Sequence, residues 1–361
     1  MKTASLFAIE RERFTIAPTS MSKPDVIIDP QPRTMEMIFD AEARRRLSDI
    51  AKLTIFDTGR MPAAMLEEAL PNAQILIGQT DLPRDRLEQA TKLRAIFNVE
   101  GNFLPNIDYQ YCFERGIRVL IASPAFAVSV AEMALAFALD LARGVSRSDR
   151  AMRERRETYG LASNQGYSLF TGYRVGIIGF GDLARAFRPL IRPFRCPVKV
   201  YDPWLPPREI LQHECTPSPL DEVLSSSDAI FVFASVTSEN QGFLGKREFD
   251  LIRPGALFVL MSRAGVVDFD ALTAAAQSGH LRVATDVFPD EPLSKDHPIR
   301  DLPDVLLSAH RAGGTPEAFL EIGNMVVSDV ELLLRGLPPI SCKLAHPETV
   351  SRFRGKPVAV S

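Results

Sequence analysis

The sequence has few of the residues that build disulfide frameworks and metal clusters. Its 361 residues include four cysteines and five histidines, and no two cysteines stand in a C-x-x-C spacing. Neither a zinc site nor a disulfide-stapled fold is expected, and no metal is predicted. Scattered cysteines of this kind are typical of proteins in a reducing compartment, so we expect a cytoplasmic protein.

Excess charge and long apolar runs are also lacking. The formal net charge is −3, with 42 basic against 45 acidic side chains, so no nucleic-acid partner is expected. The longest apolar stretch, residues 133–139, is far too short to span a bilayer, and no membrane partner is expected. Residues 1–24 carry charges at 10–13 where a secretory signal needs an apolar core. They are predicted to be an N-terminal extension, without an assigned function.

The chain does contain a regular alternation of short apolar runs and helical patterns. Such alternation predicts β-α units that build parallel sheets, and the length suffices for two cores. In the first third, we predict strands at residues 25–29, 53–56, 74–78, 93–99 and 118–121, and helices at 35–50 and 83–90. A second series of strands is predicted at residues 173–178, 198–202, 229–234, 256–261, 283–287 and 305–308, before a last helix at 316–335.

A long helical pattern at residues 126–156 separates the two series. It is apolar early and strongly basic late, which indicates a helix that leaves one core and bridges to another. We therefore predict an α/β protein with two doubly wound parallel-sheet domains of Rossmann-like or flavodoxin-like type. The first is residues 25–143, completed by 316–361, and the second is residues 144–315. The active site is expected in the cleft between them.

A glycine-rich turn follows the first strand of the second series and opens a helix. It reads Gly179-Phe180-Gly181-Asp182-Leu183-Ala184. Backbone amides of such a turn, together with the helix N-terminus, can bind the pyrophosphate of a dinucleotide. Asp202 lies 23 residues after Gly179, where a carboxylate at the end of the next strand can bond both ribose hydroxyls. This carboxylate would repel a 2′-phosphate, so NAD(H) is favoured over NADP(H). The alternative for Asp202 is a strand-end turn residue.

Four blocks of sequence resemble the D-isomer-specific 2-hydroxyacid dehydrogenase family, which includes glyoxylate/hydroxypyruvate reductases, phosphoglycerate dehydrogenases and formate dehydrogenases. The blocks are residues 116–132, 175–203, 253–272 and 286–315. The resemblance implies an NAD(H)-dependent oxidoreductase that interconverts a 2-keto acid and a D-2-hydroxy acid. Relatives are commonly dimers joined through long helices such as residues 126–156, so a homodimer is expected.

Three residues in these blocks have the chemistry that the reaction needs. Arg263 would capture the substrate carboxylate with its planar guanidinium and polarise the neighbouring carbonyl. His310 would be the acid/base, which donates a proton to the carbonyl oxygen in reduction and removes the hydroxyl proton in oxidation. Glu291 would hydrogen-bond the imidazole, fix its orientation and favour its charged form. The alternatives are a surface arginine in a loop and a structural histidine before a Gly-Gly turn.

The remaining predicted site residues line the cofactor and the substrate. Asp286 resembles the family residue that receives the nicotinamide carboxamide, and its alternative role is a helix or turn cap. The predicted cofactor-binding residues are Gly179, Gly181, Asp182, Leu183, Asp202, Ser235, Asp286 and Gly313. The predicted substrate-binding residues are Glu100, Gly101, Asn102 and Arg263.

Two segments depart from the family pattern. The carboxylate-binding loop at residues 98–108 is about two residues longer than usual and has Glu100 directly before Gly101. A carboxylate beside an anionic substrate costs energy unless it points away, is protonated or meets a cationic group. Phe233 and Ser235 stand where many relatives have His and Pro. This change predicts either an altered pocket lining or a repacked layer beneath the pocket.

Two other functions stay open on the sequence. The same fold carries NAD(H)-sensing scaffold or corepressor-like proteins that retain the three residues, and dehydrogenases of another small oxyanion such as formate or phosphonate. Tight NADH binding with poor turnover of every keto acid would indicate a scaffold. Turnover of one of those anions would indicate the second alternative.

Overall fold

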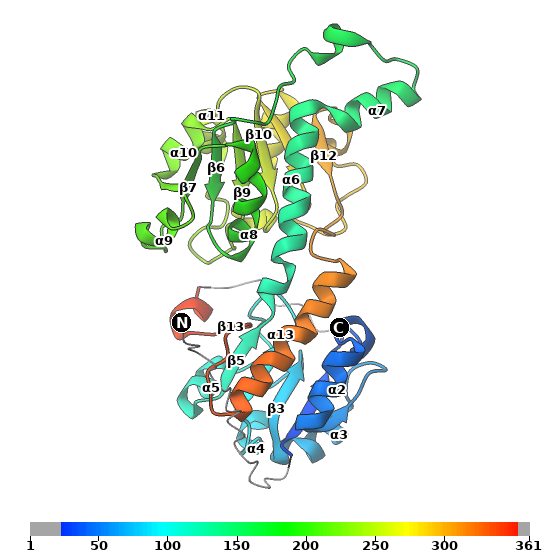
Figure 1. Ribbon diagram of the computed structural model, residues 1–361, viewed down its shortest axis with the longest axis vertical. Helices are drawn as coiled ribbons and strands as arrows, with labels where there is room; N and C mark the ends of the chain where they lie inside the picture. The colour runs from blue at the N-terminus through cyan, green and yellow to red at the C-terminus, as the bar shows by residue number, and fades with distance from the viewer. Residues whose placement is uncertain (1–22, 353–361) are drawn as a thin grey trace, which may run out of the picture.

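The computed structural model describes residues 23–352, in which two parallel sheets lie one above the other along the long axis (Figure 1). The strand order is β13-β5-β4-β3-β1-β2 in the first sheet and β12-β11-β10-β9-β6-β7-β8 in the second. Both faces of each sheet are buried: Ile27 and Ile28 of β1 point into different cores, as do Ile177 and Ile178 of β6. The predicted α/β class with two parallel-sheet domains is confirmed.

The first domain is built on the first sheet and matches most of the predicted elements. Its parallel strands are β1 (Asp25–Asp29), β2 (Lys52–Ile55), β3 (Ala73–Gly78), β4 (Ala95–Asn98) and β5 (Arg118–Ile121). Its early helices are α1 (Met35–Ile38), α2 (Ala41–Ile50), α3 (Ala63–Ala69), α4 (Arg84–Gln89) and α5 (Tyr109–Arg115). The predicted helix at residues 35–50 is wrong as a single helix. Phe39 is extended, and Asp40 starts a new helix because its carboxylate accepts a hydrogen bond from Ala43 N at 2.7 Å.

The second domain contains the remaining parallel strands. They are β6 (Val175–Ile178), β7 (Val198–Tyr201), β8 (Thr216–Pro217), β9 (Ala229–Val232), β10 (Ala256–Leu260), β11 (Leu281–Thr285) and β12 (Val305–Leu307). Its helices are α8 (Asp182–Ile191), α9 (Pro207–Leu211), α10 (Leu220–Ser226), α11 (Lys246–Leu251) and α12 (Phe269–Gln277). The edge strand β8 has two residues and was not predicted. The order of β6, β7 and β9 puts a topological switch point between β6 and β9, where open α/β sheets bind ligands.

The predicted helix at residues 126–156 is also two helices. α6 (Ala127–Arg143) ends at Gly144, whose φ of 65° is left-handed, and α7 (Val145–Arg153) then leaves in a new direction (Figure 1). The stretch Ser123–Arg143, which adds the 3₁₀ turn η2 (Ser123–Phe126), is long and apolar enough to cross a membrane. Its apolar side chains pack against α8 and the second-domain core, which accounts for that composition.

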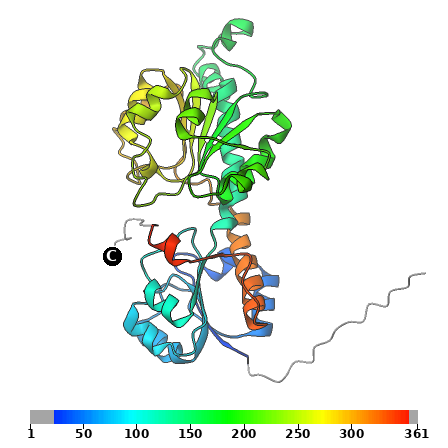
Figure 2. The same ribbon diagram turned by 90° about the vertical axis from the view of Figure 1, so that its left-hand side faces the viewer.

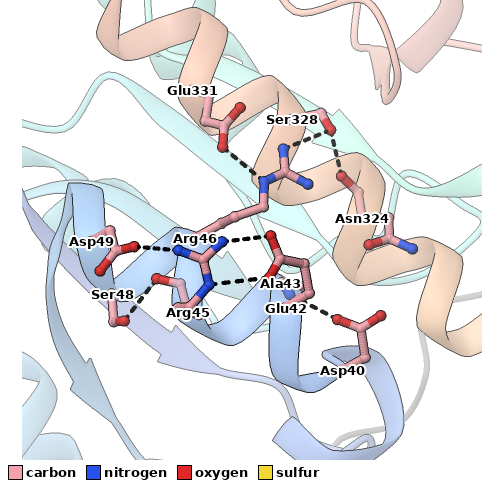
Figure 3. A network of polar contacts seen from close by, with 10 residues as sticks. All are labelled: Asp40, Glu42, Ala43, Arg45, Arg46, Ser48, Asp49, Asn324, Ser328 and Glu331. Carbon is pink, nitrogen blue, oxygen red and sulfur yellow. Dashed lines mark hydrogen bonds and ion pairs between the residues drawn. The ribbon is translucent and has the colours of Figure 1, made fainter.

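The last long helix, α13 (Pro316–Leu334), returns to the first domain and packs on α1 and α2. Arg46 of α2 donates hydrogen bonds to Glu331 at 2.9 Å and Ser328 at 3.4 Å on α13 (Figure 3). After α13 the chain forms β13 (Lys343–Leu344), antiparallel to β5, and α14 (Pro347–Val350). In Figure 2, α14 (red) lies level with the junction between the domains. Residues 1–22 of the predicted extension lie outside the described residues, as do 353–361.

Candidate active site

The glycine turn is tight on one side and open on the other. Gly179 has a φ of 84°, and a Cβ there would lie 2.5 Å from Ala234 Cα, so the turn presses against the end of β9. Gly181 is the N-cap of α8, and a Cβ there would meet no heavy atom within 4 Å. Open space directly before a helix N-terminus suits a pyrophosphate, which needs close approach to backbone amides. The residues present therefore fit a dinucleotide.

Asp202 ties the glycine turn to the end of β7. Its Oδ2 accepts a hydrogen bond from Phe180 N at 2.8 Å, and its Oδ1 accepts one from Trp204 N at 3.0 Å. This carboxylate therefore has the turn-forming role that was the alternative for Asp202. Each carboxylate oxygen still has capacity for another donor, so the ribose contact stays a prediction.

The side chains of Asp182 and Leu183 contact protein. Asp182 Oδ2 accepts hydrogen bonds from Ser123 Oγ and Lys343 Nζ, each at 3.3 Å, and both donors belong to segments that border the first domain. Leu183 packs against the second-domain core. Their backbone amides, at the first turn of α8, are the atoms that could face a phosphate.

His310 and Glu291 form the predicted pair. His310 Nδ1 lies 2.6 Å from Glu291 Oε2, while Glu291 Oε1 accepts a hydrogen bond from Phe288 N at 3.0 Å. Both oxygens of the carboxylate are thus engaged, which fixes the imidazole in one orientation and leaves Nε2 as its available nitrogen. The His310 side chain keeps 42% of its surface exposed, as an acid/base that must meet a substrate requires. Its φ of 49° is uncommon for a residue with a Cβ and needs support from its surroundings.

The loop after His310 is held by groups from β11 and α6. Asp286, 1% exposed, accepts hydrogen bonds from Arg311 N at 3.0 Å and Ala312 N at 2.8 Å. Ser129 Oγ of α6 donates to Ala312 O at 2.6 Å. Asp286 therefore has its alternative role, as a brace for a turn, and its carboxamide contact stays a prediction. Gly313 lies against Phe126, whose ring atom is 3.2 Å from the position of a Cβ.

Arg263 follows β10 and reaches the loop of the first domain. Its Nη1 donates to Ser262 O at 2.7 Å. With the Asn102 amide oriented to satisfy its hydrogen bonds, Asn102 Oδ1 accepts from Arg263 Nη2 at 2.8 Å, and Nδ2 donates to Gly101 O at 3.3 Å. The predicted clamp and the predicted substrate loop thus meet.

The Arg263 residue is exposed, although the protein around its guanidinium removes part of its hydration. Desolvation by the surrounding protein lowers the pKa of its guanidinium, and the nearby Glu291 and Glu100 carboxylates oppose that shift. Arginine stays protonated under such conditions because its ordinary pKa is so high. Arg263 therefore offers a substrate a positive charge that is only partly hydrated.

Glu100 meets a cationic group that sequence reasoning missed. Arg33 Nη2 donates to Glu100 Oε1 at 2.8 Å, and Arg33 Nε donates to Val99 O at 2.9 Å. The guanidinium also lies over the rings of Phe319 at 4.6 Å and Phe126 at 5.7 Å. The carboxylate before Gly101 is thus paired, which removes the electrostatic objection to an anionic substrate.

Phe233, which stands where many relatives have His, belongs to a packed layer of aromatic side chains. Phe233 is 4% exposed and packs on Phe187 and Phe231, with ring centroids 5.4 Å and 6.2 Å away. Ser235 is exposed, and its carbonyl accepts a hydrogen bond from Asn240 Nδ2 at 2.8 Å. Ser235 remains on the surface of the second domain, and its cofactor contact stays a prediction.

Comparison with known proteins places the chain in a family. Residues 135–312 match the family model described as D-isomer specific 2-hydroxyacid dehydrogenase, NAD binding domain. A phosphoglycerate oxidoreductase from Rhizobium etli is 44% identical and superimposes with a TM-score of 0.82, covering 90% of this chain and 99% of that one. The chain belongs to the D-isomer-specific 2-hydroxyacid dehydrogenase family. Its second domain is the NAD-binding domain of this family of oxidoreductases.

Relatives within the D-isomer-specific 2-hydroxyacid dehydrogenases include enzymes of different length. D-3-phosphoglycerate dehydrogenase of Mycobacterium tuberculosis (strain ATCC 25618 / H37Rv) is 32% identical over 271 residues, 74% of this chain and 50% of the relative. A provisionally named 2-hydroxyacid dehydrogenase of Bacillus subtilis (strain 168), YoaD, is 30% identical over 253 residues, 68% of this chain and 72% of the relative. The chain spans about half the length of the first of these curated relatives.

Proposed function

We propose that the chain is an NAD(H)-dependent oxidoreductase that interconverts a 2-keto acid and a D-2-hydroxy acid. The observation that carries this proposal is the pairing of His310 with Glu291 at 2.6 Å, near Arg263, which contacts Asn102 and whose charge the Glu291 carboxylate affects. An oriented acid/base and a carboxylate-binding cation are the two groups that the reaction requires beside the cofactor.

The proposed roles follow from the donor and acceptor atoms. NADH, when bound, supplies a hydride to the carbonyl carbon. Arg263 binds the substrate carboxylate and polarises the carbonyl, with backbone amides at residues 100–102 on the opposite side. His310 donates a proton from Nε2 to the carbonyl oxygen while Nδ1 remains hydrogen-bonded to Glu291. The Glu291 carboxylate stabilises the imidazolium before that transfer, and in oxidation the same nitrogen accepts the hydroxyl proton.

NAD(H) is the proposed cofactor in preference to NADP(H). The Asp202 carboxylate lies at the end of β7, next to the glycine turn, where the adenosine ribose of a dinucleotide lies in this type of fold. A 2′-phosphate there would meet a carboxylate instead of a cation. We expect NADH to be bound at least about tenfold more tightly than NADPH, as titrations of both cofactors would measure.

We propose that the chain forms a homodimer whose interface includes α7 and the segment after it. The described part of α7 has no buried residue. Five large apolar side chains on this arm are exposed: Val145 at 60%, Met152 at 49%, Tyr159 at 76%, Leu161 at 88% and Leu169 at 66%. Apolar groups gathered on a projecting arm favour burial against a second copy. Light scattering should give a dimer mass, and the Met152→Glu/Leu161→Glu variant should give a monomer; a monomeric wild type would refute the proposal.

The test of the proposed reaction is NADH oxidation with a panel of 2-keto acids. The panel contains glyoxylate, hydroxypyruvate, pyruvate, bulkier 2-keto acids, and 3-phosphohydroxypyruvate, which corresponds to the substrate named in the phosphoglycerate relatives. Arg263→Ala and His310→Ala are run beside the wild type, with Arg45→Ala on the exposed face of α2 as the control. Turnover by the wild type and the control, lost in both cleft variants, supports the proposal.

Two other outcomes would contradict the proposed reaction. NADH binding without turnover of any keto acid would move the assignment to an NAD(H)-sensing scaffold. Turnover of formate or phosphonate alone would move it to a dehydrogenase of another small oxyanion.

A further inference from the structure

The C-terminal segment, residues 343–352, belongs to the first domain by packing but reaches the second. Lys343 and Leu344 pair with β5, and Ala345 N donates to Val119 O at 2.8 Å. The turn before Lys343 is fixed by Asp329 of α13, which is fully buried and accepts hydrogen bonds from the backbone N–H groups of Ile340, Ser341 and Cys342 at 2.7–3.2 Å. The position of Lys343 is therefore set by the core of the first domain.

One contact with the second domain is made at the glycine turn. Lys343 Nζ donates to Asp182 Oδ2 at 3.3 Å, and Asp182 is the residue directly after Gly181. The two side chains are 45% and 33% exposed, so the pair by itself contributes little to stability. The carboxylate nevertheless stands beside the amides that suit a pyrophosphate, and an uncompensated negative charge there would repel a phosphate.

A second pair of contacts is made at the other end of the segment. The Arg352 guanidinium lies 4.3 Å from the centre of the Trp204 ring, and Ser238 N donates to Arg352 O at 3.1 Å. Trp204 comes two residues after Asp202, whose carboxylate accepts a hydrogen bond from Trp204 N. The segment thus spans from the glycine turn to the Asp202 side of the dinucleotide site.

We propose that the C-terminal segment completes the dinucleotide site, with Lys343 as a phosphate-binding residue supplied by the first domain. Lys343 neutralises Asp182 and donates a further hydrogen bond to the pyrophosphate, since an ammonium has three donors. Arg352 on Trp204 holds the segment across the adenosine end. The proposal rests on the NAD(H) site proposed above. Both domains then determine the affinity for the cofactor, because residues 343–352 belong to the first domain and contact the second.

The single tryptophan of the chain makes this proposal measurable in the enzyme without substrate. Quenching of Trp204 fluorescence reports binding of NADH, of ADP-ribose, which retains the pyrophosphate, and of adenosine, which has no phosphate. We expect Lys343→Met to weaken NADH and ADP-ribose binding about tenfold and adenosine binding less than about twofold. Lys246→Met, at an exposed pair on α11, is the matched control and should bind like the wild type.

Adding Asp182→Asn to Lys343→Met shows whether the single variant binds weakly because of the Asp182 charge or because its fold is damaged. In the Lys343→Met/Asp182→Asn double variant the repelling carboxylate is gone, so ADP-ribose affinity should return to within about threefold of the wild type. Arg352→Ala should leave the tryptophan more accessible to iodide quenching and weaken NADH binding. Wild-type affinity for ADP-ribose in Lys343→Met, or a double variant as weak as the single one, would overturn the proposal. A wild type that binds no NADH would instead overturn the proposed function on which it rests.

Discussion

Arg33 Nη2 lies 2.8 Å from Glu100 Oε1, so a cation from the loop before α1 neutralises the carboxylate next to the substrate loop. The side chains are 12% and 26% exposed, and two aromatic rings cover the guanidinium. Glu100 also offsets, through its charge, the desolvation of Arg263. The acid that looked incompatible with an anionic substrate is therefore part of a balanced set of charges.

Removing Arg33 should leave Glu100 uncompensated beside the substrate. We expect Arg33→Ala to raise KM for 2-keto acids about 5–100-fold, since a partly screened like charge at short range costs roughly 1–3 kcal/mol. The Arg33→Ala/Glu100→Ala double variant should recover most of that loss. Steady-state kinetics of both variants measure the effect. A double variant as impaired as the single one would show that Arg33 acts through packing on the two rings instead of through charge.

Glu291→Gln should lower kcat while leaving NADH binding unchanged. The amide can still bond the imidazole but no longer stabilises its charged form, so we expect a loss of about 10–100-fold in keto-acid reduction. A glutamine side chain has one acceptor oxygen where the carboxylate has two, so Phe288 N and His310 Nδ1 no longer have separate acceptors and the imidazole is held less firmly. Steady-state kinetics measure kcat, and a Glu291→Gln enzyme with the kcat of the wild type would contradict the assigned role of Glu291.

Asp329→Ala should destabilise the protein by removing a buried acceptor. The variant leaves three backbone N–H groups at residues 340–342 without their buried acceptor, which we expect to cost about 2–4 kcal/mol. Thermal unfolding measures the shift, with Asp49→Ala on the exposed face of α2 as the control. An unfolding midpoint equal to that of the control would mean that this turn is not part of the cooperative unit.

The cysteines give a pH-dependent prediction. Burial, with a smaller contribution from Asp108, raises the pKa of the Cys112 thiol to about 12, whereas an unfolded thiol ionises near about 8.5. The stability contributed by the protonated thiol is therefore fully present below about pH 8.5 and is lost as pH rises toward 12.

All four thiols are buried, so iodoacetamide at pH 8 should label them only after unfolding. Rapid labelling of the native protein would contradict this.

Sequence predicted those features whose signals are local. The β-α alternation gave nearly every strand to within a few residues, and the spacing of Gly179 and Asp202 located the nucleotide turn because both lie within one β-α-β unit. The helix breaks were missed although Asp40 and Gly144 are standard cap residues, since the residues on both sides of each break are good helix formers.

Contacts between distant segments carried no such signal. Arg33 and Glu100 are 67 positions apart, and nothing distinguishes this arginine in sequence from the many that lie on the surface. Lys343 lies on a strand of two residues, too short for any periodicity, and reaches Asp182 only because β13 pairs with β5. The pairing of charges around the site therefore could not be predicted without the tertiary structure. The residues Arg263, Glu291 and His310 could be predicted from sequence alone.

The central claim is tested most directly by following the hydrogen that is transferred. NADH deuterated at the transferable positions of its nicotinamide should deliver deuterium to carbon 2 of the product, in the D configuration, with one product molecule formed per NADH consumed. The same measurement on His310→Ala should show a large loss of rate with NADH still bound. A product without deuterium at carbon 2, or one of L configuration, would contradict the account.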